Sequence, residues 1–204
     1  MTHDSPLLER FGHIDIYIFD QLLRGRITHG QRILDAGCGT GRNLVYLLRE
    51  GFDLWASDRD AVAVQEVRAL AARLAPGLPA DRFRVEPVEA LSHDAGSMDV
   101  VISSAVLHFA TDDAHFDAMV GAMWRLLAPG GILFARLASS IGMTQPMQPL
   151  GHGRFLMPDG SERYVVDETR LMDMTQRLGA RLLDPLKTTV VQGQRCMTTW
   201  VVAR

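Results

Sequence analysis

One short segment constrains the fold of this 204-residue chain more than any other. Residues 32–36 (Arg-Ile-Leu-Asp-Ala) form an apolar run that suits a buried strand, and the small residues Gly-Cys-Gly-Thr-Gly follow at 37–41. The next residues predict a helix from Arg42 to about Glu50, which Gly51 ends. A strand that passes through a glycine loop into a helix is the first half of a βαβ unit, so the segment predicts a parallel sheet.

The same alternation of strand and helix continues along the chain. The last two predicted strands are joined by a short turn around Gly193, which makes them antiparallel to each other. The pattern therefore predicts an α/β, doubly wound sheet with an antiparallel strand at one edge. Further strands are predicted at residues 54–57, 83–86, 98–103, 132–137, 181–191 and 195–203. Helices are predicted at residues 7–24, from a cap at Asp60 to Leu74, at 113–127 before a turn at 128–131, and at 167–178.

Composition narrows the class of protein. The length suits a single domain over residues 1–204, and a net charge of −3 offers no basic field for nucleic acid. The two cysteines, Cys38 and Cys196, have no metal-type spacing, so we expect reduced thiols and no metal site. Residues 1–6 lack the pattern of a signal peptide, and no apolar run approaches the roughly 20 residues of a membrane helix. These features predict a cytoplasmic protein without a membrane segment.

The residues after the glycines limit which ligand the loop can hold. A phosphate-binding P-loop needs Gly-Lys-Ser/Thr at this point, whereas Arg42 and Asn43 stand here. A dinucleotide loop needs Gly-x-Gly-x-x-Gly, and Arg42 takes the place of the third glycine. S-adenosylmethionine (SAM), which has no phosphate, is the remaining candidate. A tight turn without any ligand is the structural alternative.

Two carboxylates support SAM. Asp58 follows the second predicted strand, where a carboxylate can accept hydrogen bonds from both ribose hydroxyls, although NAD proteins place an acid there too. Asp35 precedes the loop and can hold the ammonium of a methionyl group, directly or through water, and NAD has no such group. An NAD(P)-dependent oxidoreductase therefore remains a weaker alternative.

Four segments are distinctive in combination: residues 33–41 (ILDAGCGTG), 55–58 (WASD), 98–108 (MDVVISSAVLH) and 126–131 (LLAPGG). Together they resemble class I SAM-dependent methyltransferases. The resemblance implies a Rossmann-like sheet of seven strands in the order 3-2-1-4-5-7-6, with strand 7 antiparallel. The segment from Gly41 to Leu47, followed by Gly51 and Asp58, is most similar to tellurite-resistance-type small-molecule methyltransferases.

The resemblance also assigns cofactor contacts. Pro87 stands where the family often has an acid for the adenine amino group, so Glu89 and the backbone of Val88 are expected at the adenine edge, with a solvated loop as the alternative for Glu89. Tyr17 is expected on an N-terminal helical lid formed by residues 1–30, with ordinary packing as its alternative. The full expected set is Asp35, Gly37, Cys38, Gly39, Asn43, Asp58, Arg59, Val88, Glu89, Ser104 and Tyr17.

The substrate side is less defined. His108 follows the fourth predicted strand and is the candidate general base, with simple packing as the alternative. Arg136 is a candidate contact for an anionic substrate, and the loose connection 139–166 is expected on the substrate side. The function predicted is methyl transfer from SAM to a small-molecule acceptor. The alternative is a SAM-binding regulator or inactive accessory subunit, and the acceptor and oligomeric state stay open.

Overall fold

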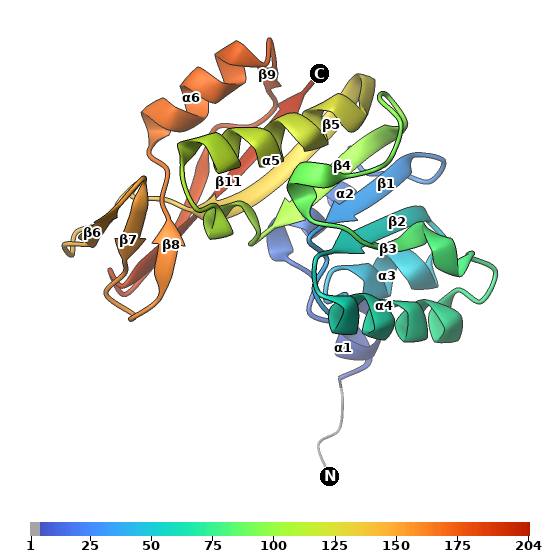
Figure 1. The fold of residues 1–204 in the computed structure, drawn as a ribbon. Coiled ribbons are helices and arrows are strands. Elements are labelled where there is room, and N and C mark those ends of the chain that lie inside the picture. The colour runs from blue at the N-terminus through green and yellow to red at the C-terminus, as the bar shows by residue number, and fades with distance from the viewer. Residues whose placement is uncertain (1–4) are drawn as a thin grey trace.

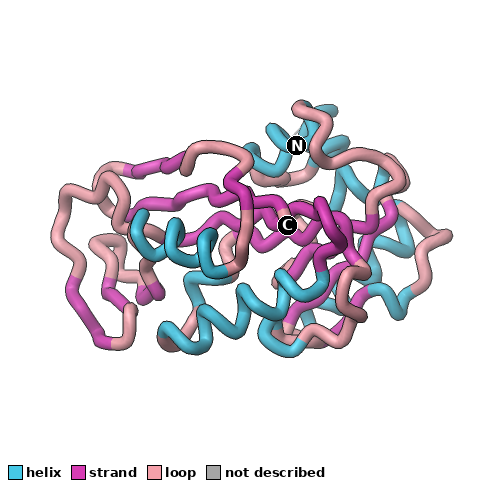
Figure 2. The backbone as a smooth tube through the Cα atoms, turned by 90° about the horizontal axis from the view of Figure 1, so that it is seen from above, coloured by secondary structure: helices cyan, strands magenta, loops and turns pink. Residues whose placement is uncertain are grey.

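A β-sheet runs through the centre of the computed structural model, which describes residues 5–204, and helices cover both of its faces (Figures 1 and 2). The strand order β3-β2-β1-β4-β5-β11-β10, with β11 antiparallel to β5 and β10, confirms the predicted order 3-2-1-4-5-7-6. A short strand, β9, pairs with β11 in addition to the seven predicted. The strands are β1 (Arg32–Ala36), β2 (Asp53–Asp58), β3 (Phe83–Val85), β4 (Met98–Ser104), β5 (Leu127–Ala138), β9 (Arg181–Leu182), β10 (Lys187–Val191) and β11 (Arg195–Ala203).

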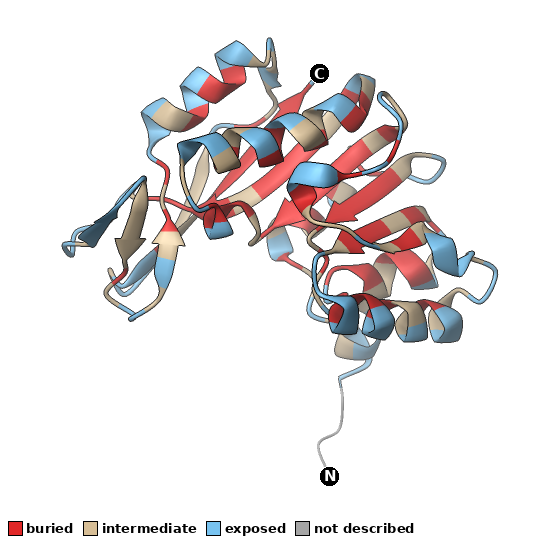
Figure 3. Ribbon diagram, in the orientation of Figure 1, coloured by how far each residue is buried: buried red, intermediate tan, exposed pale blue. Residues whose placement is uncertain are grey.

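Two apolar layers lie between the sheet and its helices. Successive side chains of a strand point to opposite faces, so Leu34 and Ile33 belong to different clusters. Leu34 packs in the layer beneath α5 (Asp113–Leu126) and α6 (Glu168–Arg177), and Ile33 in the layer that includes α2, α3 and α4. Figure 3 shows the buried residues concentrated along the strands. Both faces of the strands are therefore buried, as a doubly wound sheet requires. The second layer's helices are α2 (Ile16–Leu23), α3 (Leu44–Arg49) and α4 (Ala61–Leu74).

The N-terminal segment forms two helices, so the prediction of one helix over residues 7–24 was wrong. Gly12 ends α1 (Pro6–Phe11) with a φ of +61°, a conformation that suits glycine. Asp15 then begins α2, because its side chain accepts a hydrogen bond from the backbone N–H of Tyr17 at 3.0 Å. The first four residues of the predicted lid, and most of the segment interpreted as lacking a signal peptide, lie outside the described residues.

The connection 139–166 contains a second, three-stranded antiparallel sheet that the sequence pattern did not predict. Its strands are β6 (Gln148–Gly151), β7 (Arg154–Leu156) and β8 (Glu162–Tyr164). Tyr164 fixes β8 to the main domain, because its hydroxyl donates to Asp113 at 2.6 Å and its ring stacks on Phe116 with centroids 5.1 Å apart. Figure 1 shows this small sheet beyond the edge of the main one.

Two further boundaries differ from the prediction. The expected turn at 128–131 is an irregularity inside β5, where the pairing with β4 shifts between Met98 and Val100. The expected strand 181–191 divides into β9 and β10 around Pro185, which has no N–H to donate to a ladder. Three short 3₁₀ helices complete the fold: η1 (Ala80–Arg82), η2 (Val88–Ala90) and η3 (Leu107–Phe109).

Candidate active site

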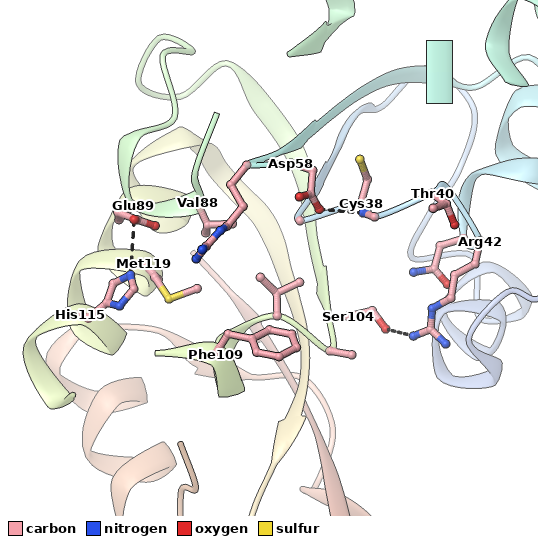
Figure 4. A pocket seen from close by; sticks show the side chains of 16 residues that line it. Cys38, Thr40, Arg42, Asp58, Val88, Glu89, Ser104, Phe109, His115 and Met119 are labelled. Carbon is pink, nitrogen blue, oxygen red and sulfur yellow. Dashed lines mark hydrogen bonds and ion pairs between the residues drawn. The ribbon is translucent and has the colours of Figure 1, made fainter. Parts of the chain in front are cut away.

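A cavity of about 630 Å³ lies at the carboxyl ends of β1, β2 and β4, where ligands bind in open α/β sheets. The glycine loop forms one side of it, and η2 and the start of α5 form the opposite side (Figure 4). We call it the first cavity. Its lining residues are Gly37, Cys38, Gly39, Thr40, Arg42, Asn43, Asp58, Arg59, Val88, Glu89, Ser104, Ala105, Val106, Phe109, His115 and Met119.

The glycine loop is packed on one side and open on the other. A Cβ at Gly37 would lie 2.5 Å from Cγ2 of Val106, and the residue has a φ of +82°. A Cβ at Gly39, with a φ of +51°, would meet no atom within 4 Å. The N–H groups of Gly37 and Cys38 donate to the carbonyl of Ser57 at 2.8 and 2.9 Å, which holds the loop against β2. A ligand can therefore approach the backbone closely at Gly39.

Asp58 is held in place at the end of β2. One carboxylate oxygen accepts from the backbone N–H of Gly39 at 2.8 Å, and the other accepts from the N–H of Asp60 at 2.9 Å. Each oxygen keeps a lone pair for a further donor. The carboxylate lines the cavity and can accept hydrogen bonds from a ligand with two neighbouring hydroxyls.

Asp35 lies buried near the loop with neither carboxylate oxygen hydrogen-bonded within residues 5–204. Burial raises the pKa of this carboxyl to about 7, while the charge of Arg42 opposes the rise and that of Asp58 adds to it. An unpartnered buried carboxylate is costly, so the position fits an ammonium group or a bridging water. Burial, followed by the charges of Asp35 and Asp58, raises the pKa of the Cys38 thiol, which therefore stays protonated.

The opposite side of the cavity offers an oriented acceptor. The N–H of Thr111 donates to Nδ1 of His115 at 3.2 Å, so in the neutral imidazole Nε2 carries the proton. Nε2 lies 3.4 Å from Oε1 of Glu89, and both side chains line the cavity with Met119 and Val88 (Figure 4). This side combines a carboxylate with apolar surface, which suits the edge and face of a heterocycle.

A second cavity of about 430 Å³ adjoins the first, and Arg42, Ala105 and Phe109 line both. His108 lines only the second cavity. Burial, and then the charge of Arg163, lowers the pKa of His108 to about 4, so its imidazole is neutral at pH 7. The second cavity is lined by Arg42, Ala105, His108, Phe109, Arg136, Ala138, Met157, Asp159, Ser161, Arg163, Thr189, Val191, Arg195, Cys196 and Met197.

Asp15 ties the N-terminal helix to the boundary between the two cavities. Its buried carboxylate accepts from Oγ of Ser104 and from Nη1 of Arg136, each at 3.1 Å. Arg42 donates to the same Ser104 hydroxyl at 3.0 Å, and Asn43 accepts from the backbone N–H of Asp15 at 3.0 Å. The start of α2 therefore positions side chains that face both cavities.

Comparison with known proteins gives a consistent result. A family model described as a methyltransferase domain matches residues 33–131. A ubiquinone biosynthesis O-methyltransferase of Methylocella silvestris is 38% identical over 110 residues, 54% of this chain and 41% of the relative. A SAM-dependent methyltransferase of Methanosarcina mazei has a similar structure, with a TM-score of 0.71 and 18% identity over 90% of this chain and 96% of that one.

Residues 33–131 form a methyltransferase domain, and the fold of the chain is that of SAM-dependent methyltransferases. The 1,6-didemethyltoxoflavin N1-methyltransferase of Burkholderia thailandensis, solved with 1,6-didemethyltoxoflavin and S-adenosylhomocysteine, shares the fold. Its TM-score is 0.68 at 19% identity, covering 90% of this chain and 75% of that one. The chain spans about two fifths of the length of the curated Methylocella relative, so the activity of that relative does not transfer directly to this chain. The nearer resemblance to tellurite-resistance-type enzymes stays a prediction.

The matched part of the methyltransferase domain holds every residue that lines the first cavity. Arg136, Arg163 and Arg195, which line the second cavity, lie beyond it. The part of the chain that the structure describes contains no cluster of three or more metal-ligating side chains and no helix suited to crossing a membrane.

The structure brings most of the predicted cofactor residues together. Asp35 lies near the loop without lining the cavity, and Tyr17 lies outside it, with its hydroxyl 2.8 Å from Oγ1 of Thr189. Residues that line the first cavity as predicted are Gly37, Cys38, Gly39, Asn43, Asp58, Arg59, Val88, Glu89 and Ser104. Lining residues absent from the prediction are Thr40, Arg42, Ala105, Val106, Phe109, His115 and Met119.

Proposed function

We propose that this chain transfers the methyl group of SAM to a small-molecule acceptor. The observation that carries the proposal is the first cavity, where an open glycine backbone and an oriented carboxylate stand beside a buried carboxylate without a partner. The second cavity supports it, because it offers space for an acceptor directly beside the first. The family match and the small-molecule substrates named for similar proteins agree with this arrangement.

Each side chain has a distinct task in the proposed complex. Asp58 accepts hydrogen bonds from the ribose hydroxyls, and Asp35 holds the ammonium directly or through water, which removes the cost of its unpartnered burial. Val88 and Glu89 meet the adenine edge on the opposite side of the cavity. The remaining predicted contacts shape the cavity between these anchors: Gly37, Cys38, Gly39, Asn43, Arg59 and Ser104.

SAM supplies an activated methyl group on a sulfonium, so the protein's main contribution is to align the acceptor. Ala105 and Phe109 line both cavities and therefore mark where the two ligands meet. His108 reaches the acceptor side as a neutral imidazole, and Nδ1 has no hydrogen-bond partner among the described residues. With a pKa of about 4 it is a weak base, suited to accept a hydrogen bond from an acceptor O–H or N–H.

The chain segments around the site have proposed roles too. The small sheet within 139–166 belongs to the acceptor side, because Met157 and Arg163 line the second cavity. The N-terminal segment contributes through Asp15 at the boundary of the cavities. The ring of Tyr17 supports the acceptor side from behind, because the guanidinium of Arg136 lies 5.3 Å from its centre. We interpret residues 1–204 as one domain. A cytoplasmic location remains a prediction, consistent with two free cysteines.

A transfer assay tests the function. The protein is incubated with SAM carrying a labelled methyl group and a panel of small-molecule acceptors, and labelled product is counted. We expect label in at least one acceptor, and about tenfold less label when Asp58→Ala replaces the wild type at low SAM. Binding of SAM with no transfer across the panel would favour the alternative, a SAM-binding regulator. Binding of NADH in preference to SAM would favour the oxidoreductase.

A further inference from the structure

The second cavity has a charge that the rest of the chain does not share. Four arginines line it, namely Arg42, Arg136, Arg163 and Arg195, against the single carboxylate of Asp159. The whole chain has a net charge of −3, so this concentration of cations is a local feature. Arginines gathered in a cavity recognise oxyanions, because the guanidinium group presents several donors in a fixed plane.

Two of these arginines are free to bind a ligand. Among residues 5–204, no carboxylate lies within ion-pair distance of Arg163 or Arg195. Arg163 donates from Nη1 to the carbonyl of Glu162 at 2.8 Å, and its guanidinium lies 5.1 Å from the centre of the Phe109 ring. Asp159 accepts instead from the N–H and hydroxyl of Ser161 at 3.0 and 2.6 Å.

Asp159 offsets only part of this charge. Its hydrogen bonds from Ser161, and then the charges of Arg195 and Arg163, keep its pKa below the ordinary value of 3.8. It is therefore ionised at neutral pH and contributes one negative charge. His108 contributes none, because it is neutral. Asp15 contributes a second negative charge beside the cavity, 3.1 Å from Arg136 and 3.8 Å from Arg42. The lining therefore keeps a net positive charge, which Arg163 and Arg195 supply.

A third arginine lacks a partner for a buried atom. Arg136 donates from Nη1 to Asp15 at 3.1 Å, but its Nε is buried without a hydrogen-bond partner in the described structure. An unsatisfied buried N–H of a charged group carries a desolvation cost that an acceptor oxygen would remove. Arg136 stands on β5, so this requirement is built into the main sheet and not into a surface loop.

The rest of the lining is apolar. Phe109, Met157, Val191 and Met197 share the second cavity with the arginines. An inorganic ion would leave this surface and most of a 430 Å³ volume without a contact. The combination fits a molecule with an apolar body and one or two oxyanion groups.

We propose that the methyl acceptor is an organic anion, a carboxylate or phosphate, whose charged group is held by the arginines of the second cavity. This inference rests on the proposed function. The acceptor's nucleophilic atom lies towards Ala105 and Phe109, and its lone pair forms the bond to the methyl carbon while the carbon–sulfur bond breaks towards sulfur. A proton on the nucleophile passes to water. The anionic anchor itself does not react, so the arginines act on binding and orientation.

The test measures ligand binding by calorimetry on the whole protein saturated with S-adenosylhomocysteine. The probes are phenylacetate and phenyl phosphate, with neutral phenylacetamide and inorganic phosphate for comparison. We expect at least one organic anion to bind about tenfold or more tightly than the amide, since one charge-assisted pair is worth about that factor. Comparison of the two organic anions identifies which oxyanion the cavity prefers, and weaker binding of inorganic phosphate would show the contribution of the apolar wall.

Arginine variants locate the effect. The double variant Arg163→Gln/Arg195→Gln should lose the preference for the organic anion over the amide. Its affinity for S-adenosylhomocysteine should stay within about twofold of the wild-type value. Arg154→Gln is the matched control, because Arg154 stands on the same small sheet but pairs with Glu162 and lines neither cavity. Equal binding of anion and amide by the wild type, or a preference that survives the double variant, would overturn the inference. Failure of S-adenosylhomocysteine to bind, with the anion preference intact, would overturn the proposed methyl transfer and leave an organic-anion site without that role.

Discussion

Alanine substitutions in the glycine loop distinguish two destabilising effects, namely backbone strain at a positive φ and steric overlap of an added Cβ. At Gly37 an added Cβ would lie 2.5 and 2.7 Å from the two γ-carbons of Val106, and the φ of +82° is unfavourable for alanine. The left-handed backbone conformation destabilises an alanine by about 1–2 kcal/mol, and the overpacking adds about 1–3 kcal/mol. We therefore expect Gly37→Ala to lower the free energy of unfolding by about 2–5 kcal/mol.

Two other glycines provide the comparison. Gly51 has a φ of +73° and Gly39 a φ of +51°, and a Cβ at either would meet nothing within 4 Å. Both alanine variants should lose only the backbone cost of about 1–2 kcal/mol. Gly39 lines the first cavity and Gly51 does not, so only Gly39→Ala should weaken S-adenosylhomocysteine binding, by about tenfold or more.

Urea denaturation gives the free energies of unfolding, and calorimetry gives the affinities. A Gly37→Ala variant as stable as Gly51→Ala would show that contact with Val106 does not limit this position. A Gly39→Ala variant that binds S-adenosylhomocysteine like the wild type would refute the close approach of a ligand to the loop.

Three further predictions concern titratable groups in or beside the two cavities. Asp58→Ala should weaken SAM binding by about tenfold or more, because it removes a charge-assisted acceptor, and unchanged affinity in calorimetry would exclude the ribose contact. His108→Ala should lower turnover more than SAM affinity, and turnover equal to that of the wild type would remove His108 from the chemistry. The wild-type pH–rate profile should show no step from this residue near pH 6.5, since its pKa is about 4. Asp35 has a folded pKa of about 7 against an ordinary 3.8, so its folded state binds more protons between these values. The ligand-free protein should therefore lose stability as pH rises from about 4 to 7, and Asp35→Asn should flatten that profile in urea denaturation; parallel profiles would refute the raised pKa.

Much of the main sheet could be predicted because its strands are short apolar runs separated by helices. The break between α1 and α2 was missed because apolar residues continue at helical spacing across Gly12 and Asp15. The small sheet was missed for a different reason. Residues of β6 are exposed throughout, so no alternation of polar and apolar residues marks the strand.

The candidate site likewise has residues that the sequence predicts and residues that it does not. The loop contacts lie close together in sequence, and the local pattern predicted four of them, namely Gly37, Cys38, Gly39 and Asn43. His115 and Met119 stand four residues apart on α5 and resemble any helix face, so their position at the cavity follows only from packing. Arg163 and Arg195 belong to β8 and β11, and no local pattern relates them before the small sheet is placed beside the main one.

Calorimetric titration of the wild-type protein with SAM tests the central claim most directly. The first cavity predicts one site per chain, with heat on binding and an affinity in the micromolar range or tighter, and no comparable binding of NADH. Absence of SAM binding at high micromolar ligand, in a protein shown to be folded by its urea transition, would contradict the account.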